Sequence, residues 1–149
     1  YIYGMTGGQV SPTTPKGNRA STAPYGNLEP AFNISGLAQA AGASFVARGD
    51  VYNVKKLEKI IKTAIQRRGF SLVEILSPCP TAYGRRNRMA HPVQLMNWLK
   101  ETTVPIEKWN KLSEKEREGK ICTGILHDVE KPEFTDEYQK LIDRLKADE

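Results

Sequence analysis

The residues with the clearest potential for chemistry lie in the first thirty positions, where glycines and hydroxyl side chains follow a short apolar run. Tyr1 to Tyr3 read as the end of a strand, and Gly4, Gly7 and Gly8 come directly after it. Glycine lets a backbone approach a ligand closely, and the N–H groups exposed in this way can bind phosphate oxygens. Open α/β sheets bind ligands just past the carboxyl ends of their strands. On composition alone, a disordered tail explains this segment equally well.

Cys79 is the second candidate, because it stands between Pro78 and Pro80 at the end of an apolar segment. A lone thiol in such a place is most often a small structural hydrophobe. The chain has two cysteines and neither belongs to a C-x-x-C pair, so this chain alone cannot hold a zinc or iron–sulfur site. Cys122 is interpreted as structural, and the low cysteine content favours a reducing, cytoplasmic setting.

Composition narrows the classes of partner. With 149 residues, 39% apolar and 26% charged, the chain is typical of a globular protein of one domain's length. No apolar run approaches the roughly 20 residues that cross a bilayer, so no membrane partner is expected. The net charge of +5 is spread along the chain, with only Arg85, Arg86 and Arg88 closely spaced, which argues against nucleic acid and is compatible with an acidic protein partner.

The pattern from residue 33 to residue 76 predicts a crossover unit. Asn33 or Ser35 can cap a short helix ending near Gly42, and residues 44–48 read as a buried strand. A helix beginning at Asn53 carries one apolar stripe, and residues 70–76 form a second buried strand. The stripe is made by Val54, Leu57, Ile60, Ile61, Ala64 and Ile65. The two strands are therefore expected to be parallel and buried on both faces.

The rest of the chain reads as mostly helical. Residues 77–87 predict a rigid, extended turn, and helices are expected from His91-Pro92 and from Pro105. Residues 121–129 alternate loosely and predict an edge strand or an extended arm. Thr135 should cap a last helix with an apolar side made by Tyr138, Leu141, Ile142 and Leu145. We divide the chain into a domain part at 1–90 and a helical extension and arm at 91–149.

The string YGMTGGQ followed by SPTT closely resembles the thiamine diphosphate and magnesium loop in the β subunit of 2-oxoacid:ferredoxin oxidoreductases, nearest to the 2-oxoglutarate type. A weaker likeness runs to about Asn87. The family's cofactor motif begins upstream of this loop, so the chain is expected to be a fragment whose N-terminal half lies elsewhere. The resemblance implies an α/β fold with a parallel sheet flanked by helices, the C-terminal half of a thiamine-diphosphate-binding domain, plus a mostly helical C-terminal extension.

The resemblance also implies roles for individual residues. Gly4, Met5 and Thr6 would contact thiamine diphosphate, and the backbone carbonyl of Ile2 would be one Mg²⁺ ligand. Cys79, in the string SPCPT, would be the last ligand of a [4Fe–4S] cluster. No catalytic side chain is assigned. Some relatives carry a lysine where this chain has Gly7, which leaves Lys16 and Arg19 as candidate anchors for a substrate carboxylate, although ordinary solvated charge explains each of them better.

The function implied is coenzyme A-dependent oxidative decarboxylation of a 2-oxo acid, first of all 2-oxoglutarate, with electrons passed through the cluster to ferredoxin. The implied partners are an α subunit of the same enzyme, ferredoxin, the 2-oxo acid and coenzyme A, in a hetero-oligomer. Because the upstream ligands lie outside the chain, this polypeptide alone is expected to be inactive. Two alternatives stay open: an incompetent fragment with a structural or subunit-interaction role, and a thiamine-diphosphate enzyme without a cluster.

Overall fold

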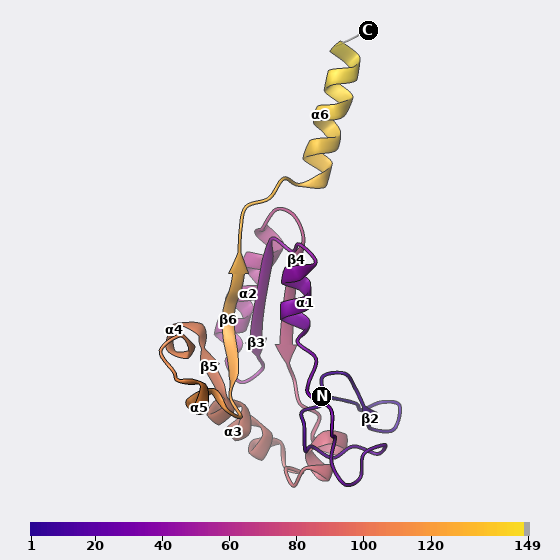
Figure 1. The fold of residues 1–149 in the computed structure, drawn as a ribbon, viewed down its shortest axis with the longest axis vertical. Helices are drawn as coiled ribbons and strands as arrows, with labels where there is room; N and C mark the ends of the chain where they lie inside the picture. Colours follow the sequence, from indigo (N-terminus) through magenta and orange to yellow (C-terminus); the bar gives the residue numbers. More distant parts are fainter. Residues whose placement is uncertain (148–149) are drawn as a thin grey trace.

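The computed structural model describes residues 1–147 and has an α/β architecture built on a four-stranded sheet (Figure 1). Strand β3 (Phe45–Asp50) and strand β4 (Ser71–Leu76) are parallel, with Phe45 opposite Ser71 and Asp50 opposite Leu76. Helix α2 (Val54–Gln66) connects them. The predicted crossover unit is therefore confirmed, with both parallel strands ending at the same edge of the sheet.

The C-terminal segment adds two strands to this sheet. Strand β6 (Ile121–Asp128) pairs antiparallel with β3, and β5 (Thr103–Pro105) pairs parallel with β6, which gives the order β4-β3-β6-β5. The prediction of an edge strand or arm at 121–129 is wrong, because β6 fills the open edge of β3 and lies inside the sheet. The extension thus contributes to the sheet as well as carrying helices, and a boundary near residue 90 stays a prediction.

Helices cover both faces of the sheet, and the alternation of β3 decides which residues meet which helix. Helix α1 (Ile34–Ala40) places Ala38 against Val46, and α2 places Ala64 against Phe45 and Ala47 on the other face. Phe45, Val46 and Ala47 are fully buried. Asn33 begins α1 as predicted, and its side chain accepts a hydrogen bond from the Gly36 N–H at 3.0 Å.

Helix α2 differs from its prediction at the cap and along the stripe. Asn53 holds the N-cap position, but its side chain donates to the Asp50 carboxylate instead of capping the helix. Val54 is 62% exposed and Ile65 79% exposed, so the apolar stripe divides between the sheet and solvent. Strand β4 is an edge strand in the described chain, which explains why Ile75 is 44% exposed although burial on both faces was expected.

Beyond β4 the chain folds into short helices. Residues Pro80–Gly84 form one π-helical turn where an extended turn was predicted, because the φ fixed by Pro80 also suits the first position of a helix. Helix α3 (Pro92–Thr102) starts as predicted, with His91 as its cap. Helix α4 (Ile106–Trp109) follows Pro105, and α5 (Glu114–Arg117) follows it.

The last helix, α6 (Phe134–Ala147), extends away from the sheet (Figure 1). Its cap is the Glu133 carboxylate, which accepts from the N–H groups of Thr135 and Asp136, so the assignment of Thr135 as the cap is wrong. No described residue of α6 is buried, and the predicted apolar side is exposed at Tyr138 and Leu145. Within residues 1–147, no helix is long and apolar enough to cross a membrane.

Candidate functional site

The glycine-rich loop is the turn of a small hairpin. Strand β1 (Ile2–Tyr3) and strand β2 (Gln9–Val10) pair antiparallel, with Ile2 opposite Val10. Gly7 and Gly8 have φ values of +123° and +80°, which strain any residue with a side chain. The Gly8 N–H donates to the Tyr3 carbonyl at 2.8 Å and closes the turn. Glycine at these two positions is therefore required by the shape of the loop itself.

The three predicted cofactor contacts lie in this turn with different surroundings. Met5 is fully exposed, so its side chain is free to meet a ligand or a partner. Thr6 is tied to Gln9, with 2.9 Å between Thr6 Oγ1 and Gln9 Oε1 and a 2.8 Å hydrogen bond from Gln9 Nε2 to the Thr6 carbonyl. Gly4 is also exposed, but it lies against the turn that follows β4. The hydrogen bonds between Thr6 and Gln9 thus hold the turn in shape without a ligand.

The segment after the hairpin is ordered by its own polar groups. Thr14 is fully buried and its hydroxyl donates to the Tyr1 carbonyl, which also accepts from the Ser11 hydroxyl at 3.0 Å. The buried Asn27 side chain donates to the Thr14 carbonyl at 2.9 Å. These contacts hold residues 1–30 in one conformation, so the disordered tail suggested by composition is wrong.

Cys79 begins the π-helical turn, and its sulfur accepts hydrogen bonds there. The Ala82 N–H donates to Sγ at 3.4 Å, and the Thr81 hydroxyl lies 3.1 Å from Sγ. The Thr81 hydroxyl and the backbone N–H of Ala82 lower the pKa of the Cys79 thiol, because both stabilise the thiolate. The thiolate is the form that binds metal, so this setting suits a ligand.

The structure brings the two separately predicted sites together. A Cβ atom placed on Gly4 would lie 3.6 Å from Cys79 Sγ and 3.8 Å from Ala82 Cβ. Gly4 therefore packs directly on the turn that presents the thiol. Because β1 and β4 are far apart in the chain, no local pattern in the sequence indicates this contact.

Arg86 and Asn87 complete the contact and were not identified from the sequence as site residues. The Arg86 guanidinium donates to the Ala82 carbonyl at 3.3 Å and to the Gly7 carbonyl at 3.4 Å, and it lies against Gly8. Asn87 accepts from the Arg19 N–H at 2.8 Å and donates to the Arg19 carbonyl at 3.0 Å. Together they clamp the loop to the turn, although in the sequence they look like part of a charged surface run.

Three aromatic side chains form a cluster next to the site. The rings of Tyr1 and Tyr83 lie 5.5 Å apart, and Trp98 from α3 lies 5.7 Å from Tyr1. Asn18 donates to the Tyr83 hydroxyl. Burial raises the pKa of Tyr83 to about 12 and also raises that of Tyr1, so both phenols are neutral at physiological pH. The cluster therefore adds no charge beside the hairpin.

The remaining candidates are placed as follows. Cys122 is buried in β6 and its pKa is raised by burial, which agrees with a structural role. His91 caps α3, and His127 Nδ1 lies 3.1 Å from Gln39 Nε2. Lys16 and Arg19 are both exposed near the loop, and nothing in the structure selects one of them as a substrate anchor.

The residues present fit the implied metals only in part. Cys79 offers one accessible thiol with a lowered pKa, which suits one of the four thiolates of a cluster. Among residues 1–147, no group of three or more His, Cys, Asp or Glu side chains could hold a metal ion. Further ligands, for a cluster or for magnesium next to the Ile2 carbonyl, would have to come from outside the described chain.

Comparison with known proteins gives a consistent result. Residues 1–75 match the family described as thiamine pyrophosphate enzyme, C-terminal TPP binding domain. The 2-oxoglutarate synthase subunit KorB of Methanocaldococcus jannaschii is 48% identical over 147 residues, covering 99% of this chain and 54% of that protein. The 2-oxoacid:ferredoxin oxidoreductase subunit beta of Saccharolobus solfataricus is 44% identical over 80 residues, covering 54% of this chain and 26% of that protein.

A solved structure agrees in fold. The 2-oxoglutarate:ferredoxin oxidoreductase from Magnetococcus marinus, with 2-oxoglutarate, coenzyme A and succinyl-CoA bound, has a TM-score of 0.77 and 29% identity, covering 97% of this chain and 50% of that one. The chain thus spans about half the length of the relatives it matches. By its sequence and its fold, the chain belongs to the thiamine pyrophosphate enzymes with this C-terminal TPP binding domain, and within them to the relatives of 2-oxoacid:ferredoxin oxidoreductase β subunits.

Proposed function

We propose that the chain is part of the β subunit of a 2-oxoacid:ferredoxin oxidoreductase acting on 2-oxoglutarate with coenzyme A. The observation that carries the proposal is the packing of Gly4, in the predicted cofactor loop, against Cys79, the predicted cluster ligand: a Cβ atom placed on Gly4 would lie 3.6 Å from the Cys79 sulfur. An enzyme that takes electrons from a cofactor-bound substrate and passes them on benefits from holding the two groups close together. The similarity to KorB over nearly the whole chain supports the same substrate class.

The chain's own residues would bind and orient in this function. Thiamine diphosphate supplies the electron sink for decarboxylation when it is bound. Gly4, Met5 and Thr6 would contact thiamine diphosphate, and the Ile2 carbonyl would be one ligand of Mg²⁺. Arg86 would hold the glycine-rich loop against the turn that presents Cys79. The α subunit, ferredoxin and a cytoplasmic location belong to the proposal as predictions.

The test uses the complete subunit assembled with its partner. We expect 2-oxoglutarate- and coenzyme A-dependent reduction of ferredoxin, and its loss in Cys79→Ser together with a loss of iron and of the electron paramagnetic resonance signal of the reduced cluster. Cys122→Ala is the matched control and should keep the iron and the signal, because Cys122 is buried in a strand.

Three other outcomes of this experiment would each favour a different interpretation of the chain. Full iron content and an unchanged signal in Cys79→Ser would make Cys79 a structural residue. Turnover without iron in the wild-type protein would favour the thiamine-diphosphate enzyme that lacks a cluster. Absence of turnover in the complete, cofactor-loaded assembly would favour a structural or subunit-interaction role.

A further inference from the structure

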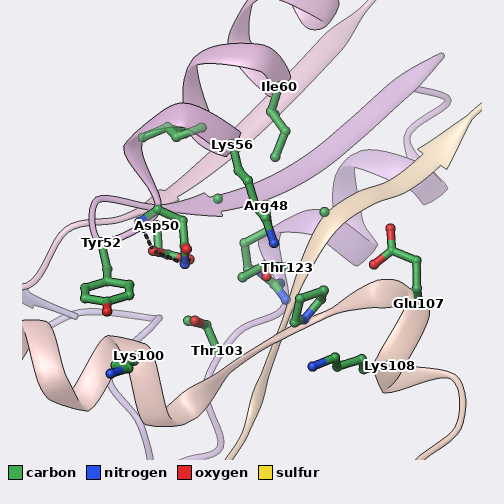
Figure 2. Close-up of a pocket in the computed structure, with 15 residues that line it drawn as sticks. Arg48, Asp50, Tyr52, Lys56, Ile60, Lys100, Thr103, Glu107, Lys108 and Thr123 are labelled. Atoms are coloured by element: carbon green, nitrogen blue, oxygen red, sulfur yellow. Dashed lines mark hydrogen bonds between the residues drawn. The ribbon is translucent and has the colours of Figure 1, made fainter.

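A hollow lies at the end of β3, and it shares no lining residue with the hairpin turn or with the turn after Cys79. It has a volume of about 350 Å³, within the range of small-molecule sites. Its lining joins Asp50 and Lys56, at the start of α2, to Thr103 of β5 and Thr123 of β6 (Figure 2). Its floor includes the carboxyl end of β3, where α/β sheets place their ligands.

Three lysines from three different helices line this hollow. Lys56 comes from α2, Lys100 from α3 and Lys108 from α4 (Figure 2). Within residues 1–147, none of them has a carboxylate within ion-pair distance. Elements far apart in the sequence thus contribute three lysines to the lining of one hollow, without a matching set of acids.

The acidic groups of the hollow do not neutralise it. Asp50 is 2% exposed, and its carboxylate accepts from both the backbone and side-chain nitrogen of Asn53. Glu107 is exposed on α4. Arg48 also borders the hollow, but its Nε lies 2.9 Å from the Glu74 carboxylate and a second nitrogen donates to Ser35 of α1, on the other face of the sheet. The three lysines therefore face two carboxylates, one of which is already bonded.

Two further features point to an anion. Thr123, a hydroxyl-bearing residue that is only 9% exposed, is among the residues that line the hollow. The first turn of α2 contains no acidic residue and Asn53 does not cap it with its side chain, although the Asp50 carboxylate accepts from the Asn53 N–H at 2.8 Å. The N-terminus of a helix favours anions, especially phosphate groups, through its free N–H groups and its dipole.

We propose that this hollow is a binding site for a phosphate-bearing ligand with at least two negative charges. A single carboxylate carries one negative charge, whereas a diphosphate carries several and can engage more than one lysine. Lysine acts as a mobile point charge toward phosphate, which suits a shallow open site. The proposal does not depend on the function proposed for the hairpin loop.

The probe is pyrophosphate, titrated into the complete protein by calorimetry in metal-free buffer containing a chelator. Without metal, a magnesium-dependent diphosphate site at the hairpin loop is silent. We expect the wild-type protein to bind pyrophosphate, Lys100→Gln to weaken binding about fourfold, and Lys100→Gln/Lys108→Gln to weaken it tenfold or more. Thr123→Val should weaken it about threefold, because the variant removes a hydroxyl that can donate to a phosphate oxygen.

The control carries the same change in charge outside the hollow. Lys55→Gln/Lys59→Gln lies on the same helix α2, and neither residue lines the hollow. Its affinity for pyrophosphate should equal that of the wild type. Absence of binding, an unchanged affinity in the Lys100/Lys108 variant, or equal weakening in the control would each overturn the proposal. With ADP as a second probe, tighter binding than pyrophosphate would assign a nucleotide, and equal binding a free polyphosphate.

Discussion

Cys79 and Cys122 are the same residue type in opposite settings, and the setting decides which of them can bind a metal. Cys79 stands at the start of a turn whose N–H and hydroxyl groups point at the sulfur, and these donors lower its thiol pKa. Cys122 is buried in a strand, and burial raises its pKa. Desolvation acts against the thiolate of Cys122, while hydrogen bonding acts in favour of the thiolate of Cys79.

This contrast predicts a pH dependence of thiol reactivity in the cluster-free protein. A thiol with a lowered pKa is already thiolate at a pH where an ordinary cysteine is protonated, so alkylation of Cys79 by iodoacetamide should rise at a lower pH than that of a cysteine in a model peptide. Alkylation of Cys122 should rise at a higher pH. Peptide mass spectrometry across pH 6 to 10 measures both.

Thr81→Val is the matched variant for this experiment. It removes the hydroxyl that contributes most to the lowered pKa, so the profile of Cys79 should move to higher pH while that of Cys122 stays. A profile of Cys79 that does not move would show that Thr81 has no influence on the thiol.

At the scale of elements, the turn after β4 is shaped by Gly84. Its N–H donates to the Cys79 carbonyl at 2.9 Å, and its carbonyl accepts from the Met89 N–H at 2.7 Å. A Cβ on Gly84 would lie 2.2 Å from the Met89 carbonyl oxygen, which is part of the backbone and cannot turn aside. The turn that presents Cys79 thus depends on the absence of one side-chain atom.

Gly84→Ala should therefore destabilise the protein by about 1–3 kcal/mol, as expected for overpacking against a rigid neighbour. Gly4→Ala is the control, since its new methyl group would meet Cys79 Sγ at an ordinary contact distance of 3.6 Å. Urea denaturation of both variants measures the difference. Equal urea midpoints for the two variants would mean that the backbone at residue 84 shifts to fit a Cβ atom without loss of stability.

Local sequence pattern predicts some of these elements correctly and others incorrectly. The helix at 54–66 and the parallel strands on either side of it follow from periodicity, and they are confirmed, although the Asn53 side chain does not cap the helix. The Pro-Cys-Pro string was interpreted as extended because proline restricts the residue before it, but Pro80 starts a helical turn as readily. Propensity of single residues does not distinguish these two outcomes, because the hydrogen bonds that decide between them reach as far as Met89.

At the scale of the whole molecule, long-range pairing was the part that the sequence did not reveal. The pairing of β6 with β3 joins residues about eighty positions apart, for which a loosely alternating segment carries no signal. The contact between Gly4 and Cys79 is of the same kind. Resemblance to a known family indicated both residues individually, but only the fold brings them together.

One partly buried cluster of charged side chains links these distant elements and is open to a direct test. Arg48 of β3 lies 2.9 Å from the Glu74 carboxylate of β4, and donates to the Cys122 carbonyl of β6 at 3.1 Å. Ser35 of α1 donates to Glu74 at 2.7 Å. The side chains of Arg48 and Glu74 are 15% and 18% exposed, so removing one partner leaves the other charge largely without solvent.

Arg48→Met should therefore cost about 2–4 kcal/mol of unfolding free energy, and Arg48→Met/Glu74→Met should recover much of that loss because no unpaired charge remains. The matched control is the pair of Arg68 with Asp136 of α6, whose side chains are 69% and 41% exposed. Arg68→Met should cost no more than about 0.5 kcal/mol, since exposed pairs contribute little. Urea denaturation at pH 7 measures all three variants. If Arg48→Met cost no more than Arg68→Met, the cluster would contribute nothing to holding β3, β4 and β6 together.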